Sequence, residues 1–246
     1  MIITFLGTKG GTGTTTMAVN CATTIRRISN QPTLLVEAKP GPGDLAVFLA
    51  LRPRYSLLEL LDQRCWTHRD RLRRFVCEHD SGLHVLVAGE AFGRPNDGDQ
   101  GAFDQVLAHV RGMYGYVVID AGSTLTSSAV TALGTTDMVM LVANPDVPCL
   151  RNVRRLSDAL RVAGVVPERI RILLNRASDQ GVMPVPQLES VLGRAIDFQV
   201  GSDYRTVASA LNSGVPIAAL RPTILQHQIE SLARTVIGPA AVLTAS

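Results

Sequence analysis

Short hydrophobic runs recur along the chain, and most of them are separated by enough residues to form a helix. The runs cover residues 2–6, 33–36, 83–88, 116–119, 138–143 and 170–174. Each has the length of a strand, and none shows the alternation of apolar and polar residues that a half-exposed strand requires. Each run therefore predicts a strand that is buried on both faces, as the strands of a parallel sheet are.

The segments between these runs carry the period of amphipathic helices. In residues 147–163, a row of aliphatic side chains falls on one helical face and the arginines fall largely on the other. Strands that alternate with helices predict an α/β fold, namely a doubly wound, mostly parallel sheet with helices on both faces. Because such sheets bind ligands beyond the carboxyl ends of their strands, residues 7–16, 37–44 and 120–124 are expected to meet at one edge.

Size and composition narrow the class of protein. A chain of 246 residues, 46% of them hydrophobic, can bury one large core, so we expect residues 1–246 to form a single domain. No apolar run reaches the roughly 18 residues of a membrane span. The C-terminal helical pattern, from residue 227 onward, lacks the basic face and bulky anchors of a membrane-targeting helix. We therefore expect a soluble cytoplasmic protein.

Arginine supplies nearly all of the positive charge. The chain has 22 arginines but only two lysines, Lys9 and Lys39, and its formal net charge is +3. Residues 68–75, HRDRLRRF, predict a basic helix with Leu72 and Phe75 on its inner side. Its arginines either cover apolar surface with their stems or form a patch for nucleic acid, whose contacts would weaken steeply with salt.

A glycine-rich stretch, GTKGGTGTTT at residues 7–16, follows the first predicted strand and precedes a predicted helix. Its glycines allow backbone N–H groups to turn toward a phosphate, and the helix adds its positive N-terminal end. The P-loop pattern G-x-x-x-x-G-K-[ST], laid on residues 8–15, places Thr14 where the lysine belongs and Thr15 at the Mg²⁺ position. The alternative is a glycine-rich turn without a ligand.

The segment KGGTGTTT resembles the deviant Walker A motif, K-G-G-x-G-K-T-T, of the ParA/MinD superfamily. The resemblance implies an ATP or ADP site with Mg²⁺ and a nucleotide-sandwich homodimer. In that arrangement Lys9 of one subunit reaches the phosphates bound by the other, Thr15 ligates Mg²⁺ and Thr16 contacts the phosphates. The cofactor-binding residues implied for the loop are Lys9, Gly10, Gly11, Thr12, Gly13, Thr14, Thr15 and Thr16.

Later segments resemble the same superfamily. YVVIDAGSTL, residues 116–125, is similar to its Walker B segment, in which Asp120 would hold Mg²⁺ through water. LLNRAS, residues 173–178, is similar to the strand end where Asn175, with Arg176 beside it, would meet the adenine base. Residues 132–156 and 203–220 resemble the ATPase half of TadZ/CpaE proteins, which place the Tad (Flp) pilus machinery at the cell pole.

Two departures from the superfamily pattern bear on catalysis. Thr14 stands in place of the P-loop lysine that would contact the phosphates in the same subunit. Since a charge-assisted hydrogen bond contributes about 1.5–3 kcal/mol, nucleotide binding is expected to weaken roughly ten- to a hundredfold. In the switch I segment, where the pattern is D-x-D-P, Glu37 keeps one carboxylate but Lys39 replaces the second. A single cation can be worth about 10³–10⁵ in the rate of phosphoryl transfer, so hydrolysis is expected to suffer more than binding.

Lys39 itself is open to two interpretations. The ordinary one is a solvated loop lysine. The other is a lysine that swings toward the phosphates and restores the missing charge.

These observations predict a degenerate ParA/MinD-type nucleotide-binding protein with weak or absent ATP hydrolysis. The resemblance implies a dimeric localisation or scaffold factor for a pilus or another polar machinery, at the cell pole through its partners. One alternative is an active ParA-like partitioning ATPase that binds DNA nonspecifically. Another is a structural dimer that binds no nucleotide. Lys9, Glu37 and Lys39 are the candidate catalytic residues.

Overall fold

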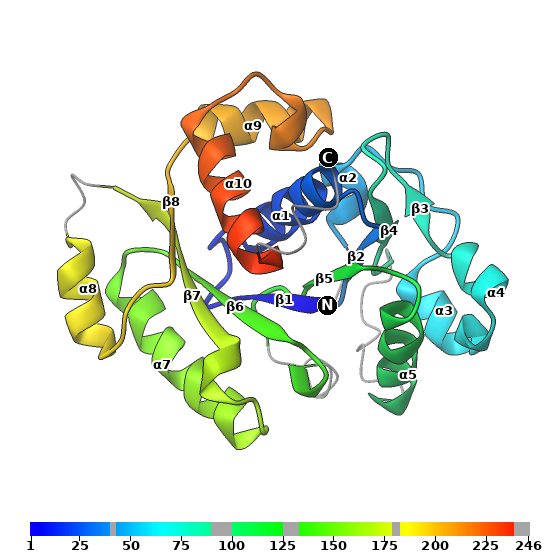
Figure 1. The fold of residues 1–246 in the computed structure, drawn as a ribbon, viewed down its shortest axis with the longest axis horizontal. Coiled ribbons are helices and arrows are strands. Elements are labelled where there is room, and N and C mark those ends of the chain that lie inside the picture. Colours follow the sequence, from blue (N-terminus) through cyan, green and yellow to red (C-terminus); the bar gives the residue numbers. More distant parts are fainter. Residues whose placement is uncertain (40–42, 90–99, 125–132, 179–182, 239–246) are drawn as a thin grey trace.

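A mixed sheet with helices on both faces forms the centre of the molecule (Figure 1). The computed structural model describes residues 1–39, 43–89, 100–124, 133–178 and 183–238. Within them the sheet has the strand order β3-β4-β2-β5-β1-β6-β7-β8. The strands are β1 (Ile2–Gly7), β2 (Thr33–Glu37), β3 (Cys77–Glu78), β4 (His84–Leu86), β5 (Tyr116–Asp120), β6 (Met138–Ala143), β7 (Ile170–Ala177) and β8 (Phe198–Gly201). All neighbouring pairs are parallel except β3 with β4.

The helices divide between the two faces of the sheet. They are α1 (Thr14–Ser29), α2 (Leu45–Phe48), α3 (Leu57–Gln63), α4 (Arg69–Arg73), α5 (Gln100–Arg111), α7 (Val147–Val162), α8 (Val185–Leu192), α9 (Tyr204–Ser213) and α10 (Ile224–Ile237), with short 3₁₀ turns η1 (Cys65–Thr67), η2 (Pro167–Arg169) and η3 (Ile217–Ala219). Helices α1, α2, α9 and α10 share one hydrophobic cluster with one face of the strands. On the other face, α3 to α5 cover one half of the sheet and α7 and α8 cover the other.

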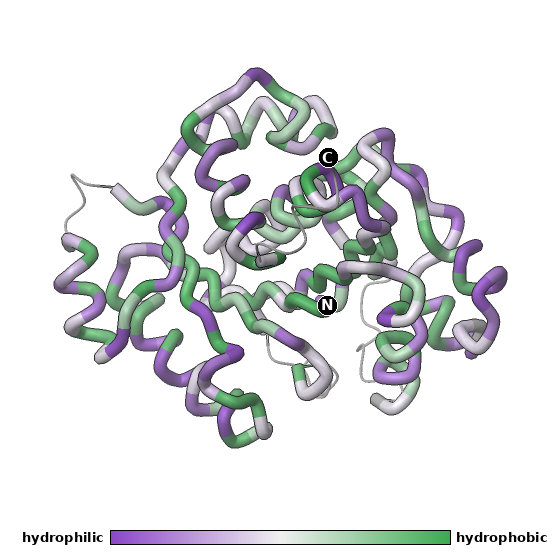
Figure 2. The backbone as a smooth tube through the Cα atoms, in the orientation of Figure 1, coloured by the Kyte–Doolittle hydropathy of each residue, from purple (hydrophilic) through white to green (hydrophobic). Residues whose placement is uncertain are grey.

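Successive side chains of β1 show why these strands lack an alternation of apolar and polar residues. Ile3 and Phe5 pack toward α1, whereas Ile2 packs toward α5 and Leu6 toward α7. Every residue of β1 is buried, because helices cover both faces of the strand. Figure 2 shows the hydrophobic residues concentrated along the central strands, while the outer helix α4 is largely hydrophilic.

The predicted fold class is confirmed, and a strand of the structure lies at each of the six hydrophobic runs. The predicted helix at 147–163 is α7, whose N-cap Asp146 accepts a hydrogen bond from the Cys149 N–H at 2.9 Å. Two strands were not predicted. β3 is only two residues long and β8 buries only Val200 fully, so neither produces a hydrophobic run.

Two further helical predictions are confirmed. Leu72 in α4 and Phe75 shortly after it are both buried on the inner side, as predicted. In α10, Ile229 and Leu232 are buried against the cluster that contains α1, as expected of a packing helix. Among the described residues, no helix is both long and apolar enough to cross a membrane.

A buried asparagine ties the first helix to the C-terminal part of the chain. Asn20 is 4% exposed; its Oδ1 accepts a hydrogen bond from the Ile217 N–H at 2.7 Å, and its Nδ2 donates to the Thr16 carbonyl at 2.8 Å. A buried backbone N–H needs an acceptor, and Asn20 supplies one to Ile217. The contact holds the start of α1, and the loop before it, against the segment that precedes α10.

We expect Asn20→Ala to lower the free energy of unfolding by about 1–3 kcal/mol, because the Ile217 N–H would be buried without an acceptor. Asn212→Ala is the matched control, since Asn212 is exposed on α9 and the same substitution should change the free energy by less than about 0.5 kcal/mol. Urea denaturation followed by circular dichroism measures both. Equal losses in the two variants would contradict this role for Asn20.

Candidate functional site

The carboxyl ends of β1, β2 and β5 meet at one edge of the sheet, as predicted. Glu37 and Asp120 are register partners at the ends of β2 and β5. Backbone hydrogen bonds continue the pairing past the strands, from the Ala38 N–H to the Asp120 carbonyl at 2.8 Å and from the Gly7 N–H to the Gly122 carbonyl at 2.7 Å. The glycine loop, the segment after Glu37 and the segment after Asp120 therefore surround a common space.

The glycine loop has the backbone of a phosphate-binding turn. Gly11 and Gly13 adopt φ angles of 78° and 88°, a region that suits glycine and few other residues. Gly13 is the N-cap of α1 and carries no side-chain cap. The first turn of α1, Thr14 to Met17, contains no acidic residue. The start of α1 therefore offers the N–H groups that have no partner inside a helix and the positive end of the helix dipole, both of which fit an anionic phosphate.

Thr14 does not mimic a lysine. Its side chain is 7% exposed, and its Oγ1 lies 3.1 Å from the hydroxyl of Thr12. A Cβ at Gly7 would collide with both hydroxyls, so the two threonines are tucked under the start of the loop. Position 14 therefore contributes packing and a hydroxyl pair inside the loop, and no positive charge toward the space above it.

Asp120 and Thr15 form the acidic part of the site. The Thr15 hydroxyl donates to Asp120 Oδ2 at 2.6 Å, and the Gly122 N–H donates to Oδ1 at 3.1 Å. Asp120 is fully buried, and burial raises the pKa of its carboxyl, helped by the charge of Glu37 and opposed by these hydrogen bonds and by the charge of Lys39. A carboxylate and a hydroxyl are the hard oxygen donors that Mg²⁺ prefers, so this pair fits such an ion.

Glu37, a candidate catalytic residue, is engaged by the protein's own backbone. Its Oε1 accepts from the Asp44 N–H at 2.6 Å and the Leu45 N–H at 3.2 Å, and its Oε2 accepts from the Ala88 N–H at 3.1 Å. The side chain is fully buried. Glu37 thus ties the start of α2 and the residues after β4 to the end of β2, which is a structural task.

Lys39 is held over the same edge. Its ammonium donates to Asp44 Oδ2 and lies 3.6 Å from Glu37 Oε1, and its side chain is only 14% exposed. Burial opposes the charge of Lys39, but the hydrogen bond to Asp44 and the negative charges of Glu37, Asp44 and Asp120 outweigh it and raise the pKa of Lys39. The interpretation of Lys39 as a solvated loop lysine is therefore wrong.

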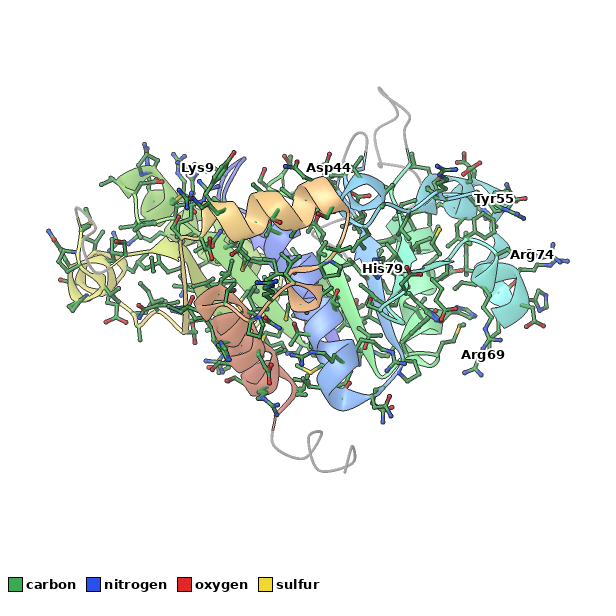
Figure 3. All side chains as sticks on the ribbon, turned by 90° about the horizontal axis from the view of Figure 1, so that it is seen from above. Lys9, Asp44, Tyr55, Arg69, Arg74 and His79 are labelled. Atoms are coloured by element: carbon green, nitrogen blue, oxygen red, sulfur yellow. The ribbon has the colours of Figure 1, made fainter. Side chains whose placement is uncertain are left out.

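The second lysine of the site, Lys9, is bound within its own chain. Its Nζ donates to Asp146 Oδ2 at 2.9 Å, a hydrogen bond that raises the pKa of Lys9. Both side chains remain accessible, with 39% and 36% exposed. The neighbouring Asn152 donates to the Thr8 carbonyl at 2.8 Å, so the first turns of α7 support the outer side of the loop. Figure 3 shows Lys9 and Asp44 along the same edge of the molecule.

Asn175 and Arg176 lie beside the loop, at the end of β7. Asn175 Nδ2 donates to the Thr12 carbonyl at 2.7 Å, and its Oδ1 accepts from the Arg176 N–H at 3.0 Å. A Cβ at Gly13 would collide with the Asn175 amide. Arg176 has a φ of 58°, unusual for a residue other than glycine, at an irregularity in the β7–β8 pairing. Asn175 therefore props the loop, and whether it also contacts a base stays a prediction.

Two adjoining cavities open at this edge. One, of about 410 Å³, is lined by the loop, the start of α1, both lysines and residues 122–124. The other, of about 310 Å³, lies between Asn175, Tyr204 and Leu225 and shares Gly13, Thr16 and Arg176 with the first. A larger hollow of about 740 Å³ lies beside residues 51–59, but neither the glycine loop nor Asp120 borders it. The residues that fit a phosphate border the two smaller cavities.

Three residues of this site were not predicted from the sequence, namely Asp44, Asp146 and Asn152. Asp44 and Asp146 each precede a helix, where an aspartate is expected as a cap. Lys9 and Asp146 are far apart in the chain, so only the three-dimensional arrangement brings them together. Asp44 is close to Lys39 in the chain, but no helical or strand spacing predicts an ion pair between them.

Comparisons with known proteins agree with this geometry. No family model matches the chain. It is 21% identical to the septum site-determining protein MinD of Thermotoga maritima over 253 residues, which cover 98% of this chain and 90% of that protein. A ParA family ATPase from Chlorobium tepidum has a similar structure, with a TM-score of 0.88 at 22% identity over 94% of this chain and 98% of that one.

A MinD from Pyrococcus horikoshii, solved in complex with Mg-ADP, superposes with a TM-score of 0.80 at 20% identity over 96% of this chain and 97% of that chain. These likenesses confirm the P-loop α/β fold. Together with the similarity in sequence over nearly the whole chain, they support the predicted resemblance to the ParA/MinD superfamily at that general level.

We expect Glu37→Gln to lower the free energy of unfolding by about 1–3 kcal/mol, because an amide NH₂ would face one of the backbone N–H groups that a carboxylate oxygen now accepts. The matched control is Glu59→Gln, since Glu59 is exposed and completes a capping box with Ser56 that glutamine also completes. Thermal and urea unfolding measure both variants. A Glu37→Gln variant as stable as the control would show that these hydrogen bonds contribute little.

Proposed function

We propose that this chain binds ATP or ADP at the edge formed by the glycine loop, and that it turns the nucleotide over slowly or not at all. The observation that carries the proposal is the loop itself. Its backbone keeps the two left-handed glycines and the open helix N-terminus of a phosphate site, while position 14 offers a buried hydroxyl where a lysine would reach the phosphates. A site of this kind is better suited to binding than to chemistry.

The acidic residues support the same conclusion. Thr15 and Asp120 are the side chains that would hold a Mg²⁺ ion, which when bound supplies positive charge to the phosphates. Positioning of an attacking water would need a further carboxylate that faces the phosphates. Glu37 has both oxygens engaged by backbone N–H groups, and Lys39 is a hydrogen-bond donor with no acceptor to offer a water proton.

We further propose a dimer in which Lys9 crosses to the partner's phosphates. Lys9 is exposed at the rim of the cavity and is bound to Asp146 by an exposed ion pair, which is worth little in water and is readily exchanged for a phosphate. The role that follows is that of a scaffold or localisation factor whose dimerisation depends on bound nucleotide. The resemblance of residues 132–156 and 203–220 to TadZ/CpaE proteins suggests a pilus or other polar machinery as the partner.

A second candidate function is that of a DNA-binding partitioning ATPase, favoured by one surface. Helix α4 and the residue after it expose Arg69, Arg71, Arg73 and Arg74, and Figure 3 shows Arg69 and Arg74 pointing away from the sheet. Such a patch would attract DNA phosphates without reading sequence. Binding to a DNA duplex that weakens steeply with salt, together with ATP turnover, would favour this candidate over the scaffold.

Titration with ADP and ATP in the presence of Mg²⁺, by calorimetry, tests the binding site. We expect wild-type protein to bind, and Gly10→Glu to lose at least about tenfold in affinity, since the new carboxylate would occupy the phosphate position at the start of α1. Gly10 has an ordinary φ, and a Cβ there would meet no atom within 4 Å, so the fold should tolerate the change.

Gly134→Glu is the matched control, because a Cβ at Gly134 also has no neighbour within 4 Å and the residue lies away from the loop. Its affinity should equal that of the wild type. Absence of nucleotide binding by the wild type would leave the structural dimer as the remaining function. Phosphate release at the rate of an ordinary ATPase would contradict the claim of slow turnover.

The dimer gives a separate prediction. Lys9→Gln should abolish nucleotide-dependent dimerisation, seen by light scattering after size exclusion, while nucleotide affinity of the monomer changes less than about threefold, because Lys9 is bound to Asp146 in its own chain. Arg161→Gln, which removes an exposed charge at the far end of α7, should dimerise like the wild type. A Lys9→Gln variant that still dimerises with nucleotide would refute the crossing lysine.

A further inference from the structure

The position of Lys39 is fixed by the end of the neighbouring strand, β5. Lys39 follows Glu37 by two residues and Gly122 follows Asp120 by two, so the register of β2 and β5 places them next to each other. The stem of Lys39 lies against Gly122, so closely that a Cβ at Gly122 would come within 2.9 Å of Lys39 Cβ. Gly122 has a φ of 63°, which together with this contact suits glycine at that position.

The ammonium of Lys39 lies beside one acid that lines the phosphate cavity, Asp44, and near two that are buried, Glu37 and Asp120. It is bonded to Asp44, lies 3.6 Å from Glu37 Oε1, and acts electrostatically on Asp120. Lys39, Asp44, Thr15 and Gly122 all line the cavity of about 410 Å³ that also contains the glycine loop. The positive charge of Lys39 therefore lies at the cavity that the glycine loop borders, within electrostatic reach of the buried Asp120.

The few lysines of the chain are concentrated at this cavity. Of the 24 basic residues, not counting histidine, only two are lysines, and both line this cavity. The chain places arginine at its other basic positions. A lysine differs from arginine in being a compact charge on a flexible stem with three donors, which suits a single contact to a phosphate oxygen or a carboxylate.

We propose that Lys39 is the resident cation of the nucleotide site: its ammonium contacts the phosphates from the side that Mg²⁺ would occupy, so that nucleotide binds equally well without Mg²⁺. The inference rests on the proposed nucleotide binding and names the source of its positive charge.

Two physical arguments support this assignment. The Lys39 ammonium already acts electrostatically on Asp120, the carboxylate that would share an ion with Thr15, so it would repel a Mg²⁺ ion bound there. The Thr15–Asp120 pair can still hold Mg²⁺, but the ion would have to replace the hydrogen bond between them, whereas the Lys39 ammonium is already held at the cavity by Asp44.

The experiment compares binding of ADP and of a non-hydrolysable ATP analogue in Mg²⁺ and in EDTA. We expect the wild-type dissociation constant to change by less than about threefold between the two conditions. Lys39→Met, which keeps the length of the side chain and removes its charge, should weaken binding in EDTA by about ten- to a hundredfold. Lys39→Asp, which supplies a carboxylate, should bind nucleotide only when Mg²⁺ is present.

Arg161→Gln is the control for loss of one positive charge, since Arg161 is exposed in a local pair with Asp158. It should match the wild type in both conditions. Thermal unfolding verifies that the Lys39 variants are folded. The ratio of dissociation constants in EDTA and Mg²⁺ separates the two possible roles, because a lysine that only orders its loop would weaken binding equally in both.

The possible outcomes separate the two proposals. A wild-type affinity that falls more than about tenfold in EDTA overturns the role of Lys39 and leaves nucleotide binding intact. The same holds if Lys39→Met binds as well as the wild type in EDTA. If wild-type protein binds neither probe in either condition, the proposed nucleotide site is itself wrong, and the role of Lys39 falls with it.

Discussion

Two carboxylates, Glu37 and Asp120, are buried side by side at the ends of adjacent strands, and the arrangement of the site depends on how their charge is accommodated. A buried charge is tolerated only when it is paired or fully hydrogen-bonded. The fold meets this requirement differently for the two. Glu37 receives three backbone N–H groups, whereas Asp120 receives one N–H and one hydroxyl and lies in the field of Lys39.

This difference separates structural from functional acids. The three amides that bind Glu37 come from the start of α2 and from the segment after β4. The charge of Glu37 therefore holds these two segments at the edge of the sheet. Asp120 keeps a raised carboxyl pKa because burial is only partly offset there. A carboxylate that is incompletely neutralised by its own chain attracts an external cation or a nearby ammonium, which is the usual condition of a binding site.

The sequence predicted the fold and the meeting of three segments at one edge, because buried parallel strands leave a single arrangement for the loops that follow them. It also predicted several of the residues that surround the loop, but not Asp146 or Asn152. It did not predict their partners. The pairs Lys9 with Asp146, Asn175 with the Thr12 carbonyl and Asn20 with the Ile217 N–H join residues more than a hundred positions apart, and no local pattern encodes them. Lys39 appeared to be a solvated loop residue for the same reason, since its burial depends on Gly122 of another strand.

The proposed location of the cation affects how the site responds to nucleotide. A lysine on the first turn of α1 would be fixed by the helix, whereas Lys39 lies on a loop segment that Asp44 and Glu37 tie down. Each hydrogen bond that the ammonium makes to a phosphate competes with its bond to Asp44, so binding of nucleotide and the Lys39–Asp44 ion pair are coupled. A differential contact of this kind is what allows a ligand to shift a conformational equilibrium. In the proposed function, a chain that couples nucleotide to the Lys39–Asp44 pair in this way is suited to signal occupancy to a partner.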